Sequence, residues 1–210
     1  MAVTTTVPGQ NARLTFSGNA GQRVSLKLSA GTMAQEKVSL LAPDGSTVFS
    51  STFANTGFVD VRTLATSGGY MLVVDPAAAN TGSLTLNLYD LPPDVAGTIS
   101  AGGAAFTVTT TAPGQNATVV FSGNSGQRIS LALSAGTMGQ EKVFLLAPDG
   151  STVFSSTFGN SGFVDVRTLA AAGSYALVVD PIGANTGSLT LALYDVPPTR
   201  RRRSALGVRP

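Results

Sequence analysis

The fold is decided by stretches such as Arg23-Val-Ser-Leu-Lys-Leu-Ser29, in which polar and apolar residues alternate one by one. A period of two places Val24, Leu26 and Leu28 on one face of an extended chain and the polar residues on the other. The same alternation recurs in residues 57–64 and 83–89, whereas Tyr70-Met-Leu-Val-Val74 is a continuous apolar run, typical of a strand covered on both faces. These patterns predict β-strands.

Turn residues separate the predicted strands. They are Ser-Gly-Asn-Ala-Gly at 17–21, Pro-Asp-Gly at 43–45, and Asn-Thr-Gly at 55–57 and again at 80–82. Gly, Asn, Asp and Pro favour tight turns because they tolerate or preset the backbone angles that turns need. Strands at a spacing of roughly 8–12 residues, with no convincing helix, are typical of a β-sandwich.

The chain is a duplication. Residues 3–93 align with residues 108–198 without a gap, and 72 of the 91 positions are identical. A unit of this size can enclose its own core, unlike the shorter units of solenoid repeats. We therefore predict an all-β chain of two tandem jelly-roll-like β-sandwiches. Its parts are a first sandwich (1–93), a linker or strand shared between the repeats (94–107), a second sandwich (108–198) and a basic, disordered tail (199–210).

The two copies do not have matching ends. Residues 94–107 have the pattern of a strand, a Gly-Gly turn and the start of another strand, but only Met1-Ala2 precedes the first copy and Thr-Arg-Arg-Arg-Arg (199–203) follows the second. Either residues 94–107 close the first copy or they open the second, and in both cases one copy has an incomplete edge with unpaired backbone groups. We expect self-assembly through strand pairing at Val3, Thr4, Thr5, Thr6, Thr98, Ile99, Ser100 and Phe106.

The composition excludes several kinds of chemistry. The 210 residues include no Cys and no His, which excludes Cys/His zinc sites, cysteine nucleophiles and Ser-His-Asp triads. The net charge is +2, but five of the 13 basic residues lie in 199–210, so residues 1–198 are weakly acidic. The arginine run has no aromatic neighbours, and no apolar run reaches the roughly 18 residues of a membrane helix. We expect neither nucleic-acid binding nor membrane insertion.

Each copy carries the same five acidic residues, spaced widely along the chain. They are Glu36, Asp44, Asp60, Asp75 and Asp90, with counterparts Glu141, Asp149, Asp165, Asp180 and Asp195. Nothing in this spacing pairs two acids for hydrolysis, so we expect no enzyme, and turn capping explains the aspartates. We expect no cofactor, with calcium as the one alternative, because loops at one end of a sandwich could gather oxygen ligands. The residues concerned are Asp75, Asn80, Asp180 and Asn185.

Three stretches of the first copy resemble the bacterial pre-peptidase C-terminal domain. They are Ala20-Gly-Gln-Arg-Val-Ser-Leu26, Leu40-Leu-Ala-Pro-Asp-Gly-Ser-Thr-Val48 and Gly68-Gly-Tyr-Met-Leu-Val-Val-Asp75, and the second copy repeats them. The resemblance implies a jelly-roll-like accessory module without catalytic residues, carried on secreted bacterial proteins. Tandem copies are also similar to the stalk regions of large bacterial surface proteins, which implies an extracellular or cell-surface location.

Two functions follow as hypotheses. The first is a non-catalytic structural module of an extracellular bacterial assembly (a filament, stalk or surface layer) whose partners are other copies of itself, joined by strand addition between domains or subunits. The alternative is an accessory module that attaches a secreted enzyme to the cell wall or to surface glycans. The alanine-rich, charge-poor surface and the absence of Trp weigh against glycan binding.

Overall fold

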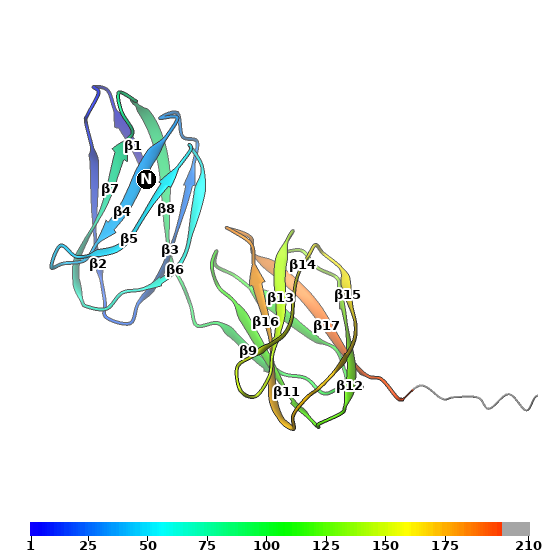
Figure 1. The fold of residues 1–210 in the computed structure, drawn as a ribbon. Coiled ribbons are helices and arrows are strands. Elements are labelled where there is room, and N and C mark those ends of the chain that lie inside the picture. Colours follow the sequence, from blue (N-terminus) through cyan, green and yellow to red (C-terminus); the bar gives the residue numbers. More distant parts are fainter. Residues whose placement is uncertain (199–210) are drawn as a thin grey trace, which may run out of the picture.

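The computed structural model describes residues 1–198, which fold into two β-sandwiches without any helix (Figure 1). The first unit has two four-stranded sheets with the strand orders β1-β8-β3-β6 and β2-β7-β4-β5. This is jelly-roll connectivity, and the all-β sandwich prediction is confirmed. Its strands are β1 (Ala2–Thr5), β2 (Ala12–Gly18), β3 (Arg23–Ser29), β4 (Glu36–Leu41), β5 (Thr47–Phe53), β6 (Gly57–Thr63), β7 (Gly68–Pro76) and β8 (Gly82–Asp90).

The second unit repeats this topology with one strand more. Its sheets have the orders β10-β17-β12-β15 and β14-β13-β16-β11-β9, so β9 extends the second sheet at the edge that β11 would otherwise form. Its strands are β9 (Val95–Thr98), β10 (Phe106–Thr110), β11 (Ala117–Gly123), β12 (Arg128–Ser134), β13 (Glu141–Leu146), β14 (Thr152–Phe158), β15 (Gly162–Thr168), β16 (Gly173–Pro181) and β17 (Gly187–Asp195).

Each core forms from the apolar faces that the alternation predicts. Val24, Leu26 and Leu28 of β3 are at most 3% exposed. Tyr70 is fully buried, and its hydroxyl donates a hydrogen bond of 2.7 Å to the carbonyl of Thr66, which satisfies the buried polar group. The ring of Tyr70 stacks on Phe16 at a centroid distance of 5.6 Å. The second unit repeats both contacts around Tyr175.

The turn residues have the roles that the sequence predicts for them. Gly45 adopts a φ of 84° in the turn between β4 and β5, a conformation that favours glycine. The carboxylate of Asp44 accepts hydrogen bonds from the backbone N–H and the hydroxyl of Ser46, at 2.9 and 2.6 Å. These bonds hold the pKa of Asp44 below its ordinary value. Asp44 therefore caps a turn.

The predicted basic tail (199–210) lies outside the described residues. Within residues 1–198, no helix is long and apolar enough to cross a membrane.

Candidate functional site: the joint between the two units

The segment between the repeats belongs to the second unit. β9 runs parallel to β11, with Val95 opposite Ala117 and Thr98 opposite Val120 (Figure 1). The N–H groups of Val95 and Ile99 donate to the carbonyls of Asn116 and Val120, at 2.9 and 3.0 Å. After a turn at Gly102, β10 pairs antiparallel with β17 of the same unit. Residues 94–107 therefore open the second unit and do not close the first.

Polar side chains fix the start of β9. The Nε2 of Gln115 donates to the carbonyl of Pro93 at 2.8 Å, and the backbone N–H of Asn116 donates to the carboxylate of Asp94 at 3.1 Å. The side chain of Gln115 is itself held, because its Oε1 accepts a hydrogen bond of 2.8 Å from the N–H of Thr111. We call Gln115 and Asn116 the clamp. It determines where a strand can begin beside β11.

The first unit contacts the same segment from its own side. The guanidinium of Arg23 forms a salt bridge of 2.7 Å with Asp94 and donates to the carbonyl of Pro92 at 3.2 Å. The hydroxyl of Ser25 donates a hydrogen bond of 2.6 Å to the carbonyl of Pro113 in the second unit. The two units therefore meet in defined polar contacts, which we call the joint.

Gly114 lies close to the first unit at the joint. Its φ is 88°, and a Cβ atom on it would lie 3.2 Å from both the Oδ1 of Asp60 and the Cβ of Ser25, and 3.3 Å from the Cδ2 of Leu91. A larger residue would therefore be strained and would also push the first unit away. The corresponding Gly9 of the first unit has no atom within 4 Å of that position, so the same turn is open there.

The edge strand of the first unit lacks the partner that β11 has. Within residues 1–198, β2 pairs only with β7, on its other side. Ala117, Val119 and Phe121 of β11 are at most 3% exposed, whereas Ala12, Leu14 and Phe16 of β2, their counterparts, are only half-buried. The core of the second unit is covered at this edge by four apolar residues: Val95, Ile99, Ala101 and Phe106. In the first unit Met1, which is 54% exposed, stands in the place of Phe106.

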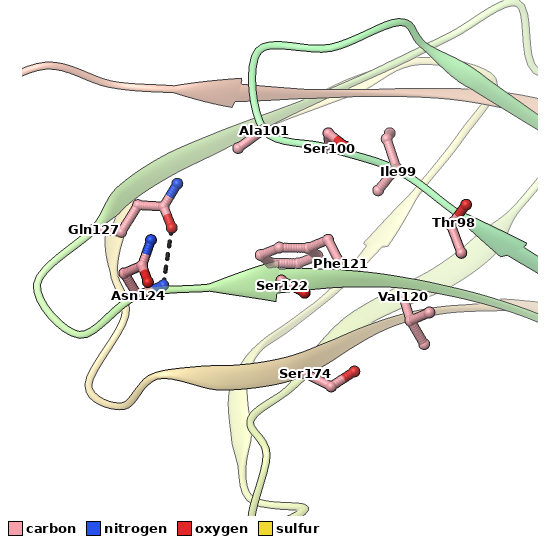
Figure 2. Close-up of a pocket in the computed structure, with 10 residues that line it drawn as sticks. All are labelled: Thr98, Ile99, Ser100, Ala101, Val120, Phe121, Ser122, Asn124, Gln127 and Ser174. Carbon is pink, nitrogen blue, oxygen red and sulfur yellow. Dashed lines mark hydrogen bonds between the residues drawn. The ribbon is translucent and has the colours of Figure 1, made fainter.

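A hollow of about 400 Å³ lies where β9 ends before β11 does (Figure 2). Its lining combines hydroxyl and amide groups with the ring of Phe121, and the backbone N–H of Asn124 donates to the Oε1 of Gln127 at 3.0 Å on its rim. Phe121 is only 3% exposed, so its ring face is covered and offers no stacking surface to a sugar. The lining residues are Thr98, Ile99, Ser100, Ala101, Val120, Phe121, Ser122, Asn124, Gln127 and Ser174.

Two buried glutamates at equivalent positions have different surroundings in the two units. Glu36 and Glu141 are both 0% exposed at the start of β4 and β13. The carboxylate of Glu36 accepts a hydrogen bond of 3.2 Å from the N–H of Asn55, whereas neither oxygen of Glu141 has a partner among the described residues. Burial raises the pKa of Glu36, which the hydrogen bond partly offsets, and raises that of Glu141 to about 7.

The residues expected at a self-assembly edge are all part of intramolecular structure. Val3, Thr4 and Thr5 pair with β8, and Thr6 follows them in a turn where its N–H donates to Gln10. In the second unit Thr98 pairs with Val120 of β11, Ile99 is buried beside it, Ser100 lies in the following turn, and Phe106 pairs with Leu191 of β17.

The residues considered for calcium lie on the strands β7 and β16 and in the loops that follow them. Asp75 and Asp180 lie opposite Lys37 and Lys142 on the neighbouring strands, and the amide of Asn185 donates to the carbonyl of Gln140. Asn80 is half-buried in the loop after β7. Within residues 1–198 no three acidic side chains come close enough together to hold a metal ion. Burial, and then the charge of Asp60, raise the pKa of Asp180.

The clamp and the identity of the open edge were not predicted from the sequence, although a signal for the edge was present. The copies differ at Arg13/Thr118, Leu14/Val119 and Thr15/Val120. The second copy has β-branched residues at all three positions, whereas the first has an arginine, which natural edge strands use against unwanted pairing. These differences indicate which copy has the covered strand.

Comparison with known proteins yields similarities of fold only. No family model and no curated protein matches the chain. Among solved structures, the pre-peptidase C-terminal domain of a Bacillus anthracis collagenase aligns over 49% of this chain and 97% of its own, with 16% identity and a TM-score of 0.40. The periplasmic lysozyme inhibitor PliG of Aeromonas hydrophila aligns over 48% and 98%, with 13% identity and a TM-score of 0.35. The tandem CBM22 domains of Paenibacillus barcinonensis Xyn10C align over 93% of both chains, with 9% identity and a TM-score of 0.25.

Proposed function

We propose that this protein is a non-catalytic structural module of an extracellular bacterial assembly, in which sandwich units follow one another head to tail through joints of one kind. Its partners are other copies of itself, and its place is the cell surface or the extracellular medium. The joint is the observation that supports this function. A spacer needs a defined angle between units, and polar contacts from both units meet here at the connecting segment.

Both halves of the joint recur at the outer ends of the chain. The turn at Pro8-Gly9 of the first unit repeats Pro113-Gly114, which contacts Ser25 and Asp60. The surface around Ser130 and Asp165 of the second unit repeats the surface that receives it. A contact between such surfaces on different copies is heterologous, and it produces a linear polymer where the rotation between copies does not close a ring.

The experiment measures assembly of the full chain. We expect light scattering after size exclusion, from micromolar to millimolar concentration, to show growing mass, and electron microscopy to show linear particles. Asp165→Trp should block the surface that receives the turn, whereas Gln140→Trp, at an exposed position in the loop between β12 and β13, is the matched control. A monodisperse monomer at every concentration would contradict the proposal.

The alternative, glycan binding, is supported by exposed aromatic side chains on the same sheet as Ser130 and Asp165. Phe163 is 59% exposed and Tyr194 is 49% exposed. They lie on β15 and β17, which both pair with β12 in one sheet, with Phe163 opposite Ala132 and Tyr194 opposite Ser130. Exposed aromatic rings on one sheet are suited to stacking on sugars. This function predicts saturable binding on a glycan array that Phe163→Ala abolishes, together with a chain that stays monomeric.

A further inference from the structure

We infer that β2 of the first unit is an acceptor for one additional strand, which runs parallel to it and has the chemistry of residues 94–101 of this chain. The inference rests on the proposed function and identifies the partner: an extended segment of a neighbouring unit of the same kind. The edge of β11 supports this inference, because β11 is the equivalent of β2 and has β9 paired with it in the same chain.

The backbone of β2 is open on the correct side. Val95 and Ile99 donate to the carbonyls of Asn116 and Val120, whose counterparts in the first unit are Asn11 and Thr15. Each residue of β2 lies opposite a residue of β7. In an antiparallel pair only every second residue exchanges hydrogen bonds with its partner, so the N–H and C=O groups of the residues between them point to the open edge. Peptide groups exposed in this way accept an added strand.

The clamp is also duplicated in the first unit. Gln10 and Asn11 correspond to Gln115 and Asn116. The Oε1 of Gln10 already accepts a hydrogen bond of 2.7 Å from the N–H of Thr6, as that of Gln115 does from Thr111 at 2.8 Å. The Nε2 of Gln10 is therefore oriented for a carbonyl group, and the N–H of Asn11 for a carboxylate. The incoming strand should begin, like β9, with a Pro-Asp pair.

The side chains at the acceptor specify which residues the incoming strand needs after that pair. Ala12, Leu14 and Phe16 are half-buried, and small or β-branched apolar residues at alternate positions, like Val95 and Ile99, would cover them. Gly97 is required in the second unit because a Cβ there would collide with the ring of Phe106.

Two of the differences between the units near this edge alter the preferred partner. Met1 replaces Phe106, so alanine is tolerated at the position of Gly97 in the incoming strand. Arg13 replaces Thr118, which lies opposite Ala96 in β9, so an acidic residue at the position of Ala96 is favoured.

The test uses the full chain and a synthetic peptide of residues 92–101, Pro-Pro-Asp-Val-Ala-Gly-Thr-Ile-Ser-Ala. We expect saturable amide shifts in the NMR spectrum at residues 10–17 and slower hydrogen exchange at Arg13 and Thr15. Ala96→Glu in the peptide should bind about twofold to fivefold more tightly, a change that corresponds to the strength of one cross-strand charge pair. Ile99→Asp in the peptide should abolish binding.

Thr15→Pro in the chain is the matched control, since it removes one N–H at the open edge and leaves the bonds to β7 in place. It should abolish peptide binding while the spectrum stays that of a folded chain. Three results would overturn the inference: shifts confined to β11, tighter binding by a peptide of residues 199–210, or dimers of the chain that pair β2 with β2 and exclude the peptide. Linear assembly without peptide binding would contradict the strand acceptor at β2 and leave the proposed structural function intact. Peptide binding to a chain that never assembles would contradict the proposed function and leave the acceptor intact.

Discussion

The strands β2 and β11 are equivalent strands of the two units with different neighbours. They occupy equivalent positions in two jelly rolls of the same topology, yet β11 lies inside a five-stranded sheet and β2 lies at an edge. The difference comes from β9, which has no counterpart beside β2 among the described residues. A single short strand therefore changes three half-buried apolar residues into fully buried ones, and the energetic consequences of that change can be measured in one molecule.

The largest effect is expected from a charge placed at the buried Ile99, directly after β9. Ile99 is 7% exposed, so Ile99→Asp would bury an unpaired carboxylate or expel the strand. Such a charge costs about 3–5 kcal/mol of unfolding free energy. We expect the second unit to unfold at lower denaturant concentration, as followed by hydrogen exchange, while the first unit is unchanged. Thr98→Asp, at the exposed neighbouring position, is the control and should cost under about 0.5 kcal/mol.

A proline substitution at the same position of β11 and of β2 should destabilise the two units by different amounts. Val120→Pro removes an N–H on the side of β11 that faces β9, and the loss of a buried hydrogen bond should cost the second unit about 2–3 kcal/mol. Thr15→Pro, at the equivalent position of β2, should cost the first unit under about 1 kcal/mol because water already solvates that group. Chemical denaturation of both variants tests the comparison. Equal losses would mean that the edge of β2 is covered within the chain.

Much of this comparison could have been predicted from the sequence, because the strands follow from alternation. The run from Arg23 to Ser29 is β3 in full, and Pro43-Asp44-Gly45 forms the turn between β4 and β5. The alternation is the same in both copies, so it does not specify which of the two equivalent edges the connecting strand pairs with; the only local sign is the set of differences between residues 13–15 and 118–120. That choice depends on non-local contacts, among them Gln115 with Pro93 and Ser25 with Pro113, which lie 22 and 88 residues apart in the sequence.

The burial of the two glutamates and the difference between their partners could not be predicted from the neighbouring sequence either. Glu36 and Glu141 have the same neighbours, Gln before and Lys-Val after, and this context resembles an exposed strand start. Their difference arises in a distant loop, where Asn55 donates to Glu36 and no described residue donates to Glu141. Beside that asparagine the sequence changes from Ala54 to Gly159 on one side and from Thr56 to Ser161 on the other, and the effect of these changes depends on tertiary packing.

This difference predicts that the two units respond unequally to pH. The pKa of Glu141 is about 7 in the folded protein and near 4.5 when unfolded, so the folded state binds more protons between these values. Stability of the second unit should therefore be greatest below about pH 4.5 and fall, on the order of 2–3 kcal/mol, as pH rises through 7. Glu141→Gln should remove this slope in denaturation measured from pH 4 to 8. Glu36→Gln is the matched variant, and it should change the first unit less.

The smallest effect is expected at the salt bridge of the joint. Arg23 and Asp94 have side chains that are 23% and 38% exposed, and ion pairs in such positions contribute under about 1 kcal/mol. Arg23→Ala should therefore leave the unfolding of both units nearly unchanged. It should nevertheless widen the range of angles between them, because Arg23 also holds the carbonyl of Pro92 at the start of the connection. Small-angle scattering and residual dipolar couplings measure that range.

Arg128→Ala is the matched control for the joint. Arg128 is the counterpart of Arg23 and donates to the carbonyl of Pro197 at 2.9 Å, away from the contact between the units. Its loss should leave the angle between the units as it is. If Arg23→Ala instead destabilised the second unit by more than about 2 kcal/mol, the attachment of β9 would depend on that charge. If the angle alone loosens, backbone pairing with β11 keeps β9 in the second unit, and the arginine serves to orient the first unit against it.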